Sequence, residues 1–492
     1  MWHAFRTLFR GSLLGKAVGF FREVLMAALY GTSAVAGAYR AAQTAVFIPI
    51  QFFTNDALNA GFLPLYARYR KEDPQEAARL FWLLGLGLVG LSLILAVVLH
   101  VGAAAWARLL LPGFAEEELA LTARLIRVMA WGVPFYFVSL LLAYLEMGNG
   151  SYTLSSLRAT VQSLGLIGGM AAAFWTGSPA LLAWGFTAAY LFLTALGLGV
   201  VWKKQLLPRP RRLFRRPALR RQLGEFWRAV RFLLPLPFFL QGNVAVERAV
   251  ASLQGVGVVE ALDYARLITE TAVVLLAVPL GLAGLSELSG VDCRRVRQQL
   301  ARLVPALLAV TVPVSCFLVF HSPAVLSLLY RRRNFDEASL AATAPVLSGL
   351  AVGLWAQVGG YVLIKVLNAR MQNRAVLFIM TGALAANAAF NVAFHRPLGP
   401  LALGLGASLY GLVVFALSLT ALKAGRELVS PLVALALLAG IYAAVEGALL
   451  AGGADGLLWA LVRFVLFWTA ALLLAPPLRP VRRALWERLR TR

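Results

Sequence analysis

The chain has 492 residues, of which 60% are hydrophobic and 14% are charged, and its mean hydropathy is +0.76. This composition excludes a soluble globular protein, and the alternating pattern of a membrane β-barrel is missing from the sequence. The net charge of +24 does not indicate nucleic-acid binding, because the cytoplasmic loops of membrane proteins collect lysine and arginine.

Apolar segments of about 20 residues recur along the whole chain, which predicts a polytopic helical membrane protein. The first segment, residues 11–30, is too long and too charged for a cleavable signal peptide, so we expect it to remain as a membrane helix. Five more spans are predicted over residues 34–66 (interrupted by Pro49 and Pro64), 78–101, 119–147, 154–175 and 179–202.

A basic segment then interrupts the pattern. Residues 203–221 hold two lysines, seven arginines and three prolines, which is typical of a cytoplasmic linker whose basic face could rest on anionic lipid headgroups. Six further spans are predicted after it, over residues 226–253, 258–288, 304–320, 338–366, 375–394 and 402–422, and two more over 431–450 and 456–475.

The predicted spans form about fourteen helices in two similar lobes and a terminal pair. We expect an N-terminal lobe of six helices over residues 1–203, a linker over 204–225, a second six-helix lobe over 226–423, and the pair with a basic tail over 424–492. Segments 178–185 and 399–406 are similar in sequence and enter the sixth helix of each lobe, which favours an internal repeat over chance similarity. Transporters built from repeats bind substrate between the lobes and alternate its access.

The charges of the loops predict that both termini are cytoplasmic. With the N-terminus inside, the predicted inner loops carry the basic clusters at residues 68–71, 203–221, 294–297, 370–374 and 423–426. The predicted outer loops are mostly neutral or acidic, with the three arginines at 331–333 as the exception.

Three charged residues lie inside the first predicted helix: Lys16, Arg22 and Glu23. Each charge near the centre of a bilayer costs at least ~2.5–3.5 kcal/mol, so a helix rarely keeps such residues without a use. Lys16 and Glu23 are seven positions apart and share a helical face, whereas Arg22 points about 100° away from Glu23. One interpretation is that Lys16 extends to a headgroup and Arg22 pairs with an acid for stability. The other is that this face lines a water-filled cavity that handles an anion.

Several segments resemble one family in order along the chain. Residues 19–23, 29–31 and 60–64 (GFFRE, LYG and AGFLP) resemble the opening of the MurJ (MviN) lipid II flippases, which belong to the multidrug/oligosaccharidyl-lipid/polysaccharide (MOP) exporter superfamily. Residues 247–252 and 261–265 resemble its seventh and eighth helices, and 328–331 with Asn334 and Phe335 resemble an outer-loop signature.

This resemblance implies a MOP-type, all-α fold and a transporter without enzymatic activity. The implied function is to move the lipid-linked peptidoglycan precursor from the inner to the outer leaflet of the bacterial cytoplasmic membrane. The expected partners are a polyprenyl-diphosphate-linked saccharide such as lipid II, membrane lipids and, as a further option, cell-wall synthesis proteins, with no nucleic acid. A flippase for an exopolysaccharide or O-antigen unit, a cation-coupled drug antiporter and a non-transporting scaffold remain as alternatives.

The chain departs from the family pattern at several charged positions. Lys16 replaces an arginine, Gly37 replaces an acid, and Ile50 and Gln51 occupy the place of a basic pair. In the eighth helix, only a one-residue shift aligns Arg266 with the arginine of the family. These differences leave the transporter interpretation intact and leave open a different lipid-linked sugar.

The resemblance and the charges together give a predicted substrate-binding set. Arg22, Lys16 and Arg266 are predicted to contact the diphosphate of the cargo, because guanidinium groups bind phosphate oxygens in pairs. Glu23 and Arg40 complete the set. Arg40 could instead be an interfacial anchor, and Arg266 could instead pair with Glu270 one helical turn away.

The resemblance also implies an ion site between the seventh and eleventh helices, at Glu247, Asn387 and Asn391. One carboxylate and two amide oxygens can form a shell for a hard cation such as Na⁺. Interhelical hydrogen bonding by the two asparagines is the alternative. No organic cofactor is expected, and H⁺ or the membrane potential could drive transport in place of Na⁺. The sequence has no nucleotide-binding loop that would supply ATP as the energy source.

Overall fold

The computed structural model of the chain describes residues 2–54, 56–208, 216–231, 235–285, 293–453 and 456–475. Within these ranges the protein consists of nineteen helices and no strand, which confirms the predicted all-α fold class. The middle of the basic linker, 209–215, and the basic tail, 476–492, lie outside the described residues. Contacts divide the chain into two units, residues 1–259 with 332–334 and residues 260–331 with 335–492. The predicted division into lobes at residues 203, 225 and 423 stays a prediction.

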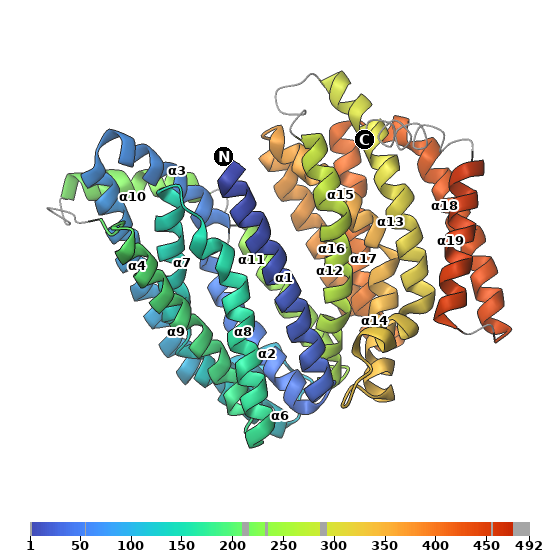
Figure 1. The fold of residues 1–492 in the computed structure, drawn as a ribbon, viewed down its shortest axis with the longest axis horizontal. Helices are drawn as coiled ribbons and strands as arrows, with labels where there is room; N and C mark the ends of the chain where they lie inside the picture. Colours follow the sequence, from blue (N-terminus) through green and yellow to red (C-terminus); the bar gives the residue numbers. More distant parts are fainter. Residues whose placement is uncertain are drawn as a thin grey trace. The chain divides into compact units, whose positions relative to one another are not determined.

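Unit 1 contains the first eleven helices and the start of the twelfth (Figure 1). They are α1 (Trp2–Tyr30), α2 (Ala34–Thr54), α3 (Asp56–Glu72), α4 (Pro74–Val101), α5 (Ala103–Leu110), α6 (Glu116–Ala130), α7 (Val133–Gly148), α8 (Thr153–Thr176), α9 (Ala180–Lys203), α10 (Arg216–Val230), α11 (Pro235–Ser252) and α12 (Val256–Leu285).

A stripe of glycines on α1 sets its packing against α8. Gly11, Gly15 and Gly19 recur every fourth residue and so lie on one face of the helix. A Cβ atom added to Gly11 would lie 2.5 Å from Cβ of Ser156, and one added to Gly15 would lie 2.8 Å from Cβ of Ala159. Small residues let membrane helices approach this closely, and the stripe thereby fixes where the charged residues of α1 stand.

Helix α10, from the end of the basic linker, lies on α3 and α4 at one end of unit 1 (Figure 1). The Glu225 carboxylate accepts hydrogen bonds from Arg68 and, at 2.9 Å, from the Tyr69 hydroxyl. Arg221 and Gln222 bind the Glu76 carboxylate at 3.0 and 2.6 Å. Partial burial acts to raise the pKa of Glu225, but these hydrogen bonds and the nearby guanidinium charges outweigh it and lower the pKa.

A loop from residues 332–334 is held against the end of α1. The amide of Asn334 donates to the Ala28 carbonyl at 3.2 Å, and its side-chain Nδ2 donates to the Leu29 carbonyl at 2.5 Å. Carbonyls in the last turn of a helix lack intrahelical partners, so Asn334 caps α1. This explains why the loop belongs to unit 1 although its neighbours in sequence belong to unit 2.

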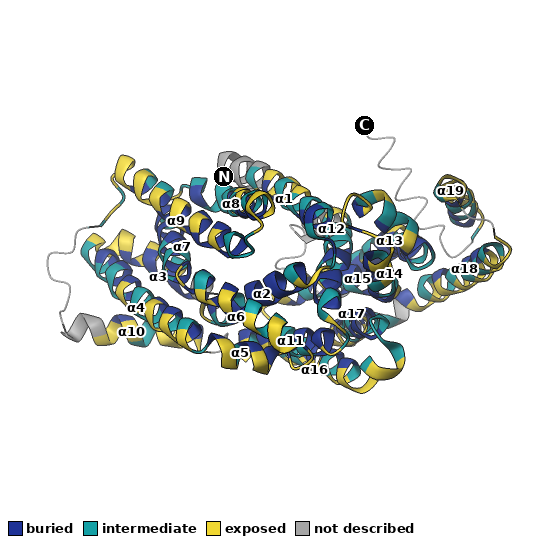
Figure 2. Ribbon diagram, turned by 90° about the horizontal axis from the view of Figure 1, so that it is seen from below, coloured by how far each residue is buried: buried dark blue, intermediate teal, exposed yellow. Residues whose placement is uncertain are grey.

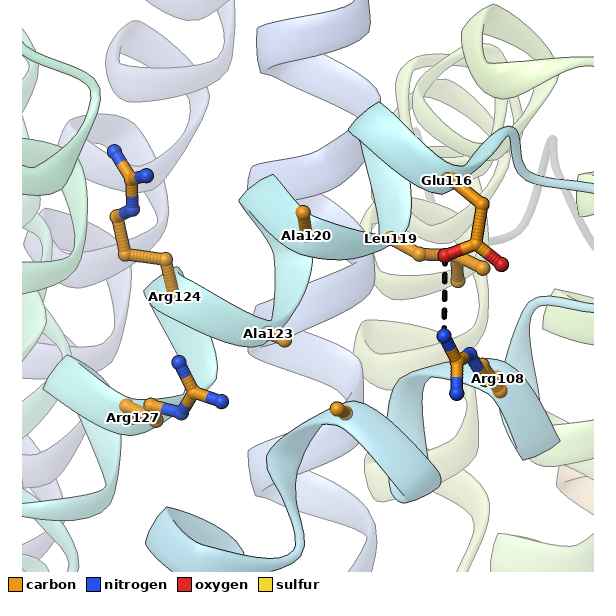
Figure 3. A pocket seen from close by; sticks show the side chains of 8 residues that line it. Arg108, Glu116, Leu119, Ala120, Ala123, Arg124 and Arg127 are labelled. Atoms are coloured by element: carbon orange, nitrogen blue, oxygen red, sulfur yellow. Dashed lines mark hydrogen bonds and ion pairs between the residues drawn. The ribbon is translucent and has the colours of Figure 1, made fainter.

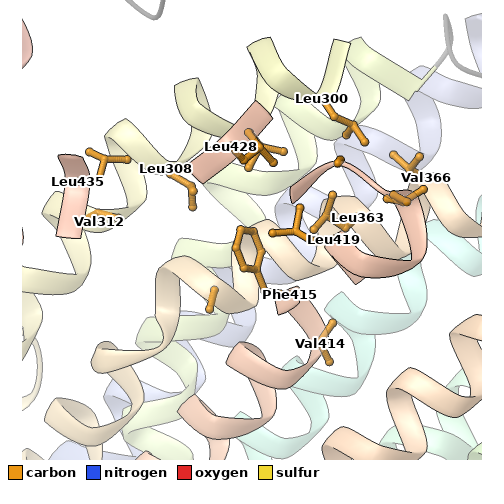
Figure 4. Packing of buried hydrophobic residues seen from close by; sticks show 14 of the residues in the cluster. Leu300, Leu308, Val312, Leu363, Val366, Val414, Phe415, Leu419, Leu428 and Leu435 are labelled. Carbon is orange, nitrogen blue, oxygen red and sulfur yellow. The ribbon is translucent and has the colours of Figure 1, made fainter. Parts of the chain in front are cut away.

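Unit 2 contains the rest of α12 and seven further helices. They are α13 (Cys293–Tyr330), α14 (Glu337–Val352), α15 (Leu354–Ala369), α16 (Asn373–Leu398), α17 (Leu401–Leu422), α18 (Gly425–Ala451) and α19 (Leu457–Leu474). Buried apolar side chains from helices that include α13, α15, α17 and α18 form its largest described core, as Figure 4 shows for Leu308, Leu363, Phe415 and Leu428.

Several predicted spans are broken in the structure. The predicted 338–366 helix bends by 50° between α14 and α15 at Gly353, and the predicted 119–147 helix bends by 43° between α6 and α7. At Gly353, Ser408 of α17 packs so closely that an added Cβ would lie 2.4 Å from its Cα, and the Ser408 hydroxyl accepts from the freed Gly353 amide at 2.7 Å. Helices α2 and α3 of the predicted 34–66 span lie on either side of residue 55, which is outside the described residues, and the predicted 226–253 span divides into α10 and α11.

Seven helices in the described part of the chain are long and apolar enough to cross a membrane, or nine if each bent pair is one span. The protein is therefore a multi-pass membrane protein, and the count of fourteen spans stays a prediction. Helix α1, which has three charged side chains in its apolar part, is not among these seven. Figure 2 shows that α2 is mostly buried, whereas α4 is exposed along one side, where residues such as Leu93 and Ile94 suit contact with lipid tails.

Candidate functional site

Helices α1 and α2 bring Arg22, Glu23 and Arg40 together in unit 1. The Glu23 carboxylate is 4% exposed and accepts from Arg22 Nε at 3.0 Å, with a second hydrogen bond from Arg22 Nη2. Arg40 Nη2 lies 2.5 Å from the other carboxylate oxygen, so both arginines share one acid. Three of the predicted substrate-binding residues thus form one buried, net-positive cluster, which we call the α1–α2 charge cluster.

Polar side chains of α2 support Arg40. Its Nη1 donates to the Gln43 side-chain oxygen at 3.3 Å, and Gln43 Nε2 donates to the Tyr39 hydroxyl at 3.0 Å. Arg40 itself is 9% exposed. A residue this buried does not resemble an interfacial anchor, whose charged group stands in the headgroup region. Its position instead fits a residue that holds Glu23 in place.

Arg22 is the most accessible member of the α1–α2 charge cluster. Its side chain is 19% exposed, compared with 11% for Arg40 and 5% for Glu23. Glu23 engages the Nε and Nη2 edge of Arg22, which leaves the remaining N–H groups of the guanidinium able to donate elsewhere. Arg22 is therefore the member best placed to meet a ligand.

Arg158 on α8 is a candidate that the sequence analysis missed. Its guanidinium carbon lies 4.4 Å from the centre of the Tyr136 ring, and its Nη2 atom is buried without a hydrogen-bond partner among the described residues. The charges of both Arg158 and Arg22 act on the Tyr190 hydroxyl, which places the two arginines in one neighbourhood. A buried N–H group without an acceptor is costly, so Arg158 is a candidate to donate to an anionic ligand.

A signal for Arg158 was present in the sequence. It is an arginine inside the predicted span 154–175, and the cost argument that selected Arg22 applies to it as well. It lies only five residues into that helix, however, where an arginine can extend to the headgroups without further function. Only the packing of α8 beside α1, and the ring of Tyr136, reveal that it points inward.

Lys16 and Arg266 stand apart from this cluster in different ways. Lys16 is exposed on α1, about two turns before Glu23, so its position allows either a headgroup contact or a ligand contact. Arg266 is partly buried on α12 in unit 2, so the contacts within unit 1 do not include it. The roles of both residues in binding cargo stay predictions.

The three predicted ion ligands are all buried, and they belong to different units of the chain. Glu247 on α11 is 2% exposed and belongs to unit 1, whereas Asn387 and Asn391 on α16 belong to unit 2. Asn391 Nδ2 donates to Asn387 Oδ1 at 2.9 Å, a hydrogen bond within α16 and not the interhelical one that the alternative interpretation expected. Asn391 Oδ1, however, is buried with no hydrogen-bond partner in the described part of the chain.

Gly406 on α17 makes room for the two asparagines. A Cβ atom at this position would lie 2.1 Å from Asn391 Oδ1 and 2.6 Å from Asn387 Oδ1. Both amide oxygens therefore pack against the backbone of α17 at Gly406. Among the described residues, no group of three His, Cys, Asp or Glu side chains could hold a metal ion, so a cation here would need these amide oxygens.

The chain is similar to proteins of known families over most of its length. The sequence model of the family described as "Lipid II flippase MurJ" matches residues 26–470. A probable lipid II flippase MurJ from Rhizobium meliloti (strain 1021) is 27% identical over 73% of this chain and 68% of that protein. The lipid II flippase MurJ of Burkholderia cenocepacia is 24% identical over 84% of this chain and 83% of that protein.

Two solved structures share the fold. A lipid II flippase MurJ in an inward closed conformation matches with a TM-score of 0.75 and 18% identity, over 98% of this chain and 99% of that one. An inward-facing multidrug resistance transporter of the MATE family, from the MOP superfamily, matches with a TM-score of 0.64 and 16% identity, over 84% of this chain and 96% of that one. At these identities the likeness concerns the fold alone, and it agrees with the family match over residues 26–470: the chain belongs to the MurJ family of lipid II flippases.

Proposed function

We propose that this protein moves lipid II, a saccharide linked to a polyprenyl diphosphate, from the inner to the outer leaflet of the bacterial cytoplasmic membrane. Membership of the MurJ family supports this cargo, and the multi-pass helical fold supports a transporter. We expect both termini in the cytoplasm, transport by alternating access and no catalytic residues. The observation that carries the proposal is that two arginines, Arg22 and Arg40, share the buried Glu23 carboxylate inside unit 1.

The chemistry of the cluster suits a diphosphate. Arg22 and Arg158 can each present a planar pair of N–H donors to phosphate oxygens, and this geometry is the strong mode of guanidinium–phosphate binding. Glu23 repels a phosphate, so we assign it to positioning Arg22 and Arg40 rather than to contact with the cargo. By neutralising one of the positive charges, Glu23 also keeps the binding weak enough for release on the far side.

The charge of the cluster argues against a drug antiporter. A carrier of organic cations needs a site lined by carboxylates, whereas the α1–α2 charge cluster has two guanidinium groups and one acid, and Arg158 on α8 adds a further guanidinium group. A different lipid-linked saccharide has the same diphosphate and would be held by the same residues. The comparison of two cargoes in the experiment below distinguishes these cases.

The ion coupling is a second part of the proposal. We infer that Na⁺ binds at Glu247, Asn387 and Asn391, with H⁺ or the membrane potential as the alternative driving forces. The unpartnered Oδ1 atom of Asn391, pressed against Gly406, supports a cation there, because an amide oxygen buried without a donor is otherwise costly.

The test measures binding of lipid II, and separately of an exopolysaccharide lipid precursor, to purified wild type and to Arg22→Ala. The loss of one charge-assisted contact, roughly 1.5–3 kcal/mol, should weaken lipid II binding by about tenfold to a hundredfold. Arg22→Lys should restore only part of this, because an ammonium group lacks the planar fork. Arg396→Ala, at an exposed arginine of α16, is the matched control and should bind normally.

Two results would contradict the proposal. If Arg22→Ala binds and moves both lipids like the wild type, Arg22 is structural and the assigned site is wrong. If the wild type binds only the exopolysaccharide precursor, the flippase assignment stands and lipid II is not the cargo.

A further inference from the structure

A second group of arginines surrounds a hollow between α5 and α6, at the end of unit 1 away from α10 (Figures 1 and 3). The hollow has a volume of about 260 Å³ and carries three guanidinium groups and one carboxylate on its walls. Arg108 of α5 pairs with Glu116 of α6 at 3.1 Å, as the dashed line in Figure 3 shows. Arg124 and Arg127, both exposed on α6, have no acidic partner among the described residues.

The sequence explains why a hollow exists here. The two helices face each other with Ala104, Ala120 and Ala123, and these small side chains leave the space between the helices unfilled. Positions 120, 123, 124 and 127 follow the spacing of one helical face, so the long arginines of α6 border the space that its alanines leave open. The result is a small apolar floor surrounded by positive charge.

Contacts with α4 give the level of the hollow relative to the membrane. Helix α4 is strongly apolar and ends at Val101, and the Nδ1 atom of His100 lies 3.2 Å from the Arg127 carbonyl. After α6, the chain continues through α7 toward the other end of α4. The last residue of α7, Gly148, accepts a hydrogen bond there from Arg70, which lies four residues before α4 begins. The residues of α6 that precede Arg127 therefore lead away from the contact with the last turn of the apolar α4, which suits the level of lipid headgroups.

Neighbouring side chains fit this depth. The indole of Trp131, one turn after Arg127, is exposed and lies 5.3 Å from the ring of His100. Val101 and Leu109 are also exposed, as expected for residues that face acyl chains. Tryptophan is enriched at the membrane interface, so an exposed Trp131 beside the hollow is consistent with a position at the level of lipid phosphate groups.

We propose that this hollow binds the phosphate group of an anionic lipid in the outer leaflet. The proposed orientation of the chain places α5 and α6 on the outer side, where arginine is otherwise disfavoured. Because Glu116 neutralises Arg108, the site presents two further guanidinium groups, Arg124 and Arg127, to a phosphate. The phosphate could belong to a resident phospholipid or to the diphosphate of the delivered cargo.

The site is separate from the one that we assign to transport. It is built from α5 and α6, whereas the α1–α2 charge cluster and Arg158 come from α1, α2 and α8. Binding at this hollow therefore does not depend on Arg22, and a failed transport assignment would leave this proposal standing.

The experiment measures the binding of phosphatidylglycerol, phosphatidylcholine, farnesyl diphosphate and inorganic phosphate to the purified full-length protein. The test variant is Arg124→Gln/Arg127→Gln, and the matched control is Arg374→Gln/Arg396→Gln, which removes two exposed arginines of α16. We expect the test variant to lose at least about tenfold in affinity for an anionic lipid, while the control binds like the wild type. Added salt should weaken the wild-type binding.

The four ligands separate the sources of the phosphate. Binding of phosphatidylglycerol above the other ligands supports a resident phospholipid, and binding of farnesyl diphosphate above phosphatidylglycerol supports the delivered cargo. The proposal is overturned if inorganic phosphate binds as well as either lipid, if phosphatidylcholine binds as well as phosphatidylglycerol, or if the test variant retains its affinity.

Discussion

The shared carboxylate of Glu23 gives the sharpest test of the α1–α2 charge cluster. In Glu23→Gln, Arg22 and Arg40 both lose the Glu23 carboxylate while their charges stay in place. Removing one partner of a buried ion pair in this way costs about 3–5 kcal/mol. We expect most of this loss to come from Arg40, because its side chain is 11% exposed and water reaches it less than it reaches Arg22 at 19%.

Removing the positive partner should cost less. In Arg40→Gln, the Glu23 carboxylate keeps its two hydrogen bonds from Arg22, so we expect a loss of about 1.5–3 kcal/mol. The double variant Glu23→Gln/Arg40→Gln removes both buried charges and should lose less stability than the two single losses together. For residues in direct contact, this coupling is about 0.5–3 kcal/mol.

The assay is equilibrium unfolding of the four proteins in detergent, followed by tryptophan fluorescence. The control is Glu337→Gln, which breaks the exposed pair of Glu337 and Arg331, whose side chains are 69% and 58% exposed, and it should cost less than about 1 kcal/mol. If Glu23→Gln costs no more than Glu337→Gln, or if the two single losses simply add in the double variant, the coupling of Glu23 and Arg40 is refuted.

Three further outcomes test other parts of the structure. Arg158→Gln should weaken lipid II binding by about tenfold without lowering the melting temperature, and unchanged binding would exclude Arg158 from the site. Na⁺ bound at the proposed ion site should raise the melting temperature, and Gly406→Ala should abolish this increase, because the new Cβ displaces the oxygen of Asn391. If the wild type melts at the same temperature in Na⁺ and in K⁺, the proposed ion site is wrong. The pKa of Glu225 is lowered, so its ionised carboxylate stabilises the fold. This contribution is fully present at pH values above 4.5, the ordinary pKa of glutamate, and is lost as the pH falls through the lowered pKa. The melting difference between wild type and Glu225→Gln should therefore be full at about pH 7 and vanish under more acidic conditions, and a difference that persists there would contradict this assignment.

Much of the fold followed from local patterns in the sequence. Apolar length predicted the helices α4, α8, α9, α16 and α17 to within a few residues. The bends were harder to predict, because hydropathy runs unbroken through Gly353 and through the junction of α6 and α7. Whether a glycine bends a helix depends on its neighbour, and at Gly353 that neighbour is Ser408, 55 residues later in the chain.

The candidate site was also predictable only in part, because some of its residues are identified by local sequence and others by contacts between helices. The cost of burying charge pointed to Arg22 and Glu23 from the first helix alone. The contact of Glu23 with Arg40 depends on how α1 and α2 pack, and the contact of Arg158 with Tyr136 depends on how α8 lies against α7. Neither contact has a fixed spacing in sequence, so the sequence left Arg40 open between two roles and passed over Arg158.

Under the proposed function, the charges of Arg40 and Arg158 would account for how the chain departs from its family's pattern and still binds a diphosphate. The family pattern has an acid at the position of Gly37 and basic residues at those of Ile50 and Gln51, and this chain has none of these. Arg40 now supplies a positive charge from the same helix, and Arg158 supplies another from α8, beside α1. A diphosphate is recognised by the number and placement of guanidinium groups around it, whichever helix they come from. While Arg158 is present, a basic residue at position 51 should add little to the affinity for lipid II. When Arg158 is removed, it should compensate, so the double variant Arg158→Gln/Gln51→Arg should bind lipid II better than Arg158→Gln alone.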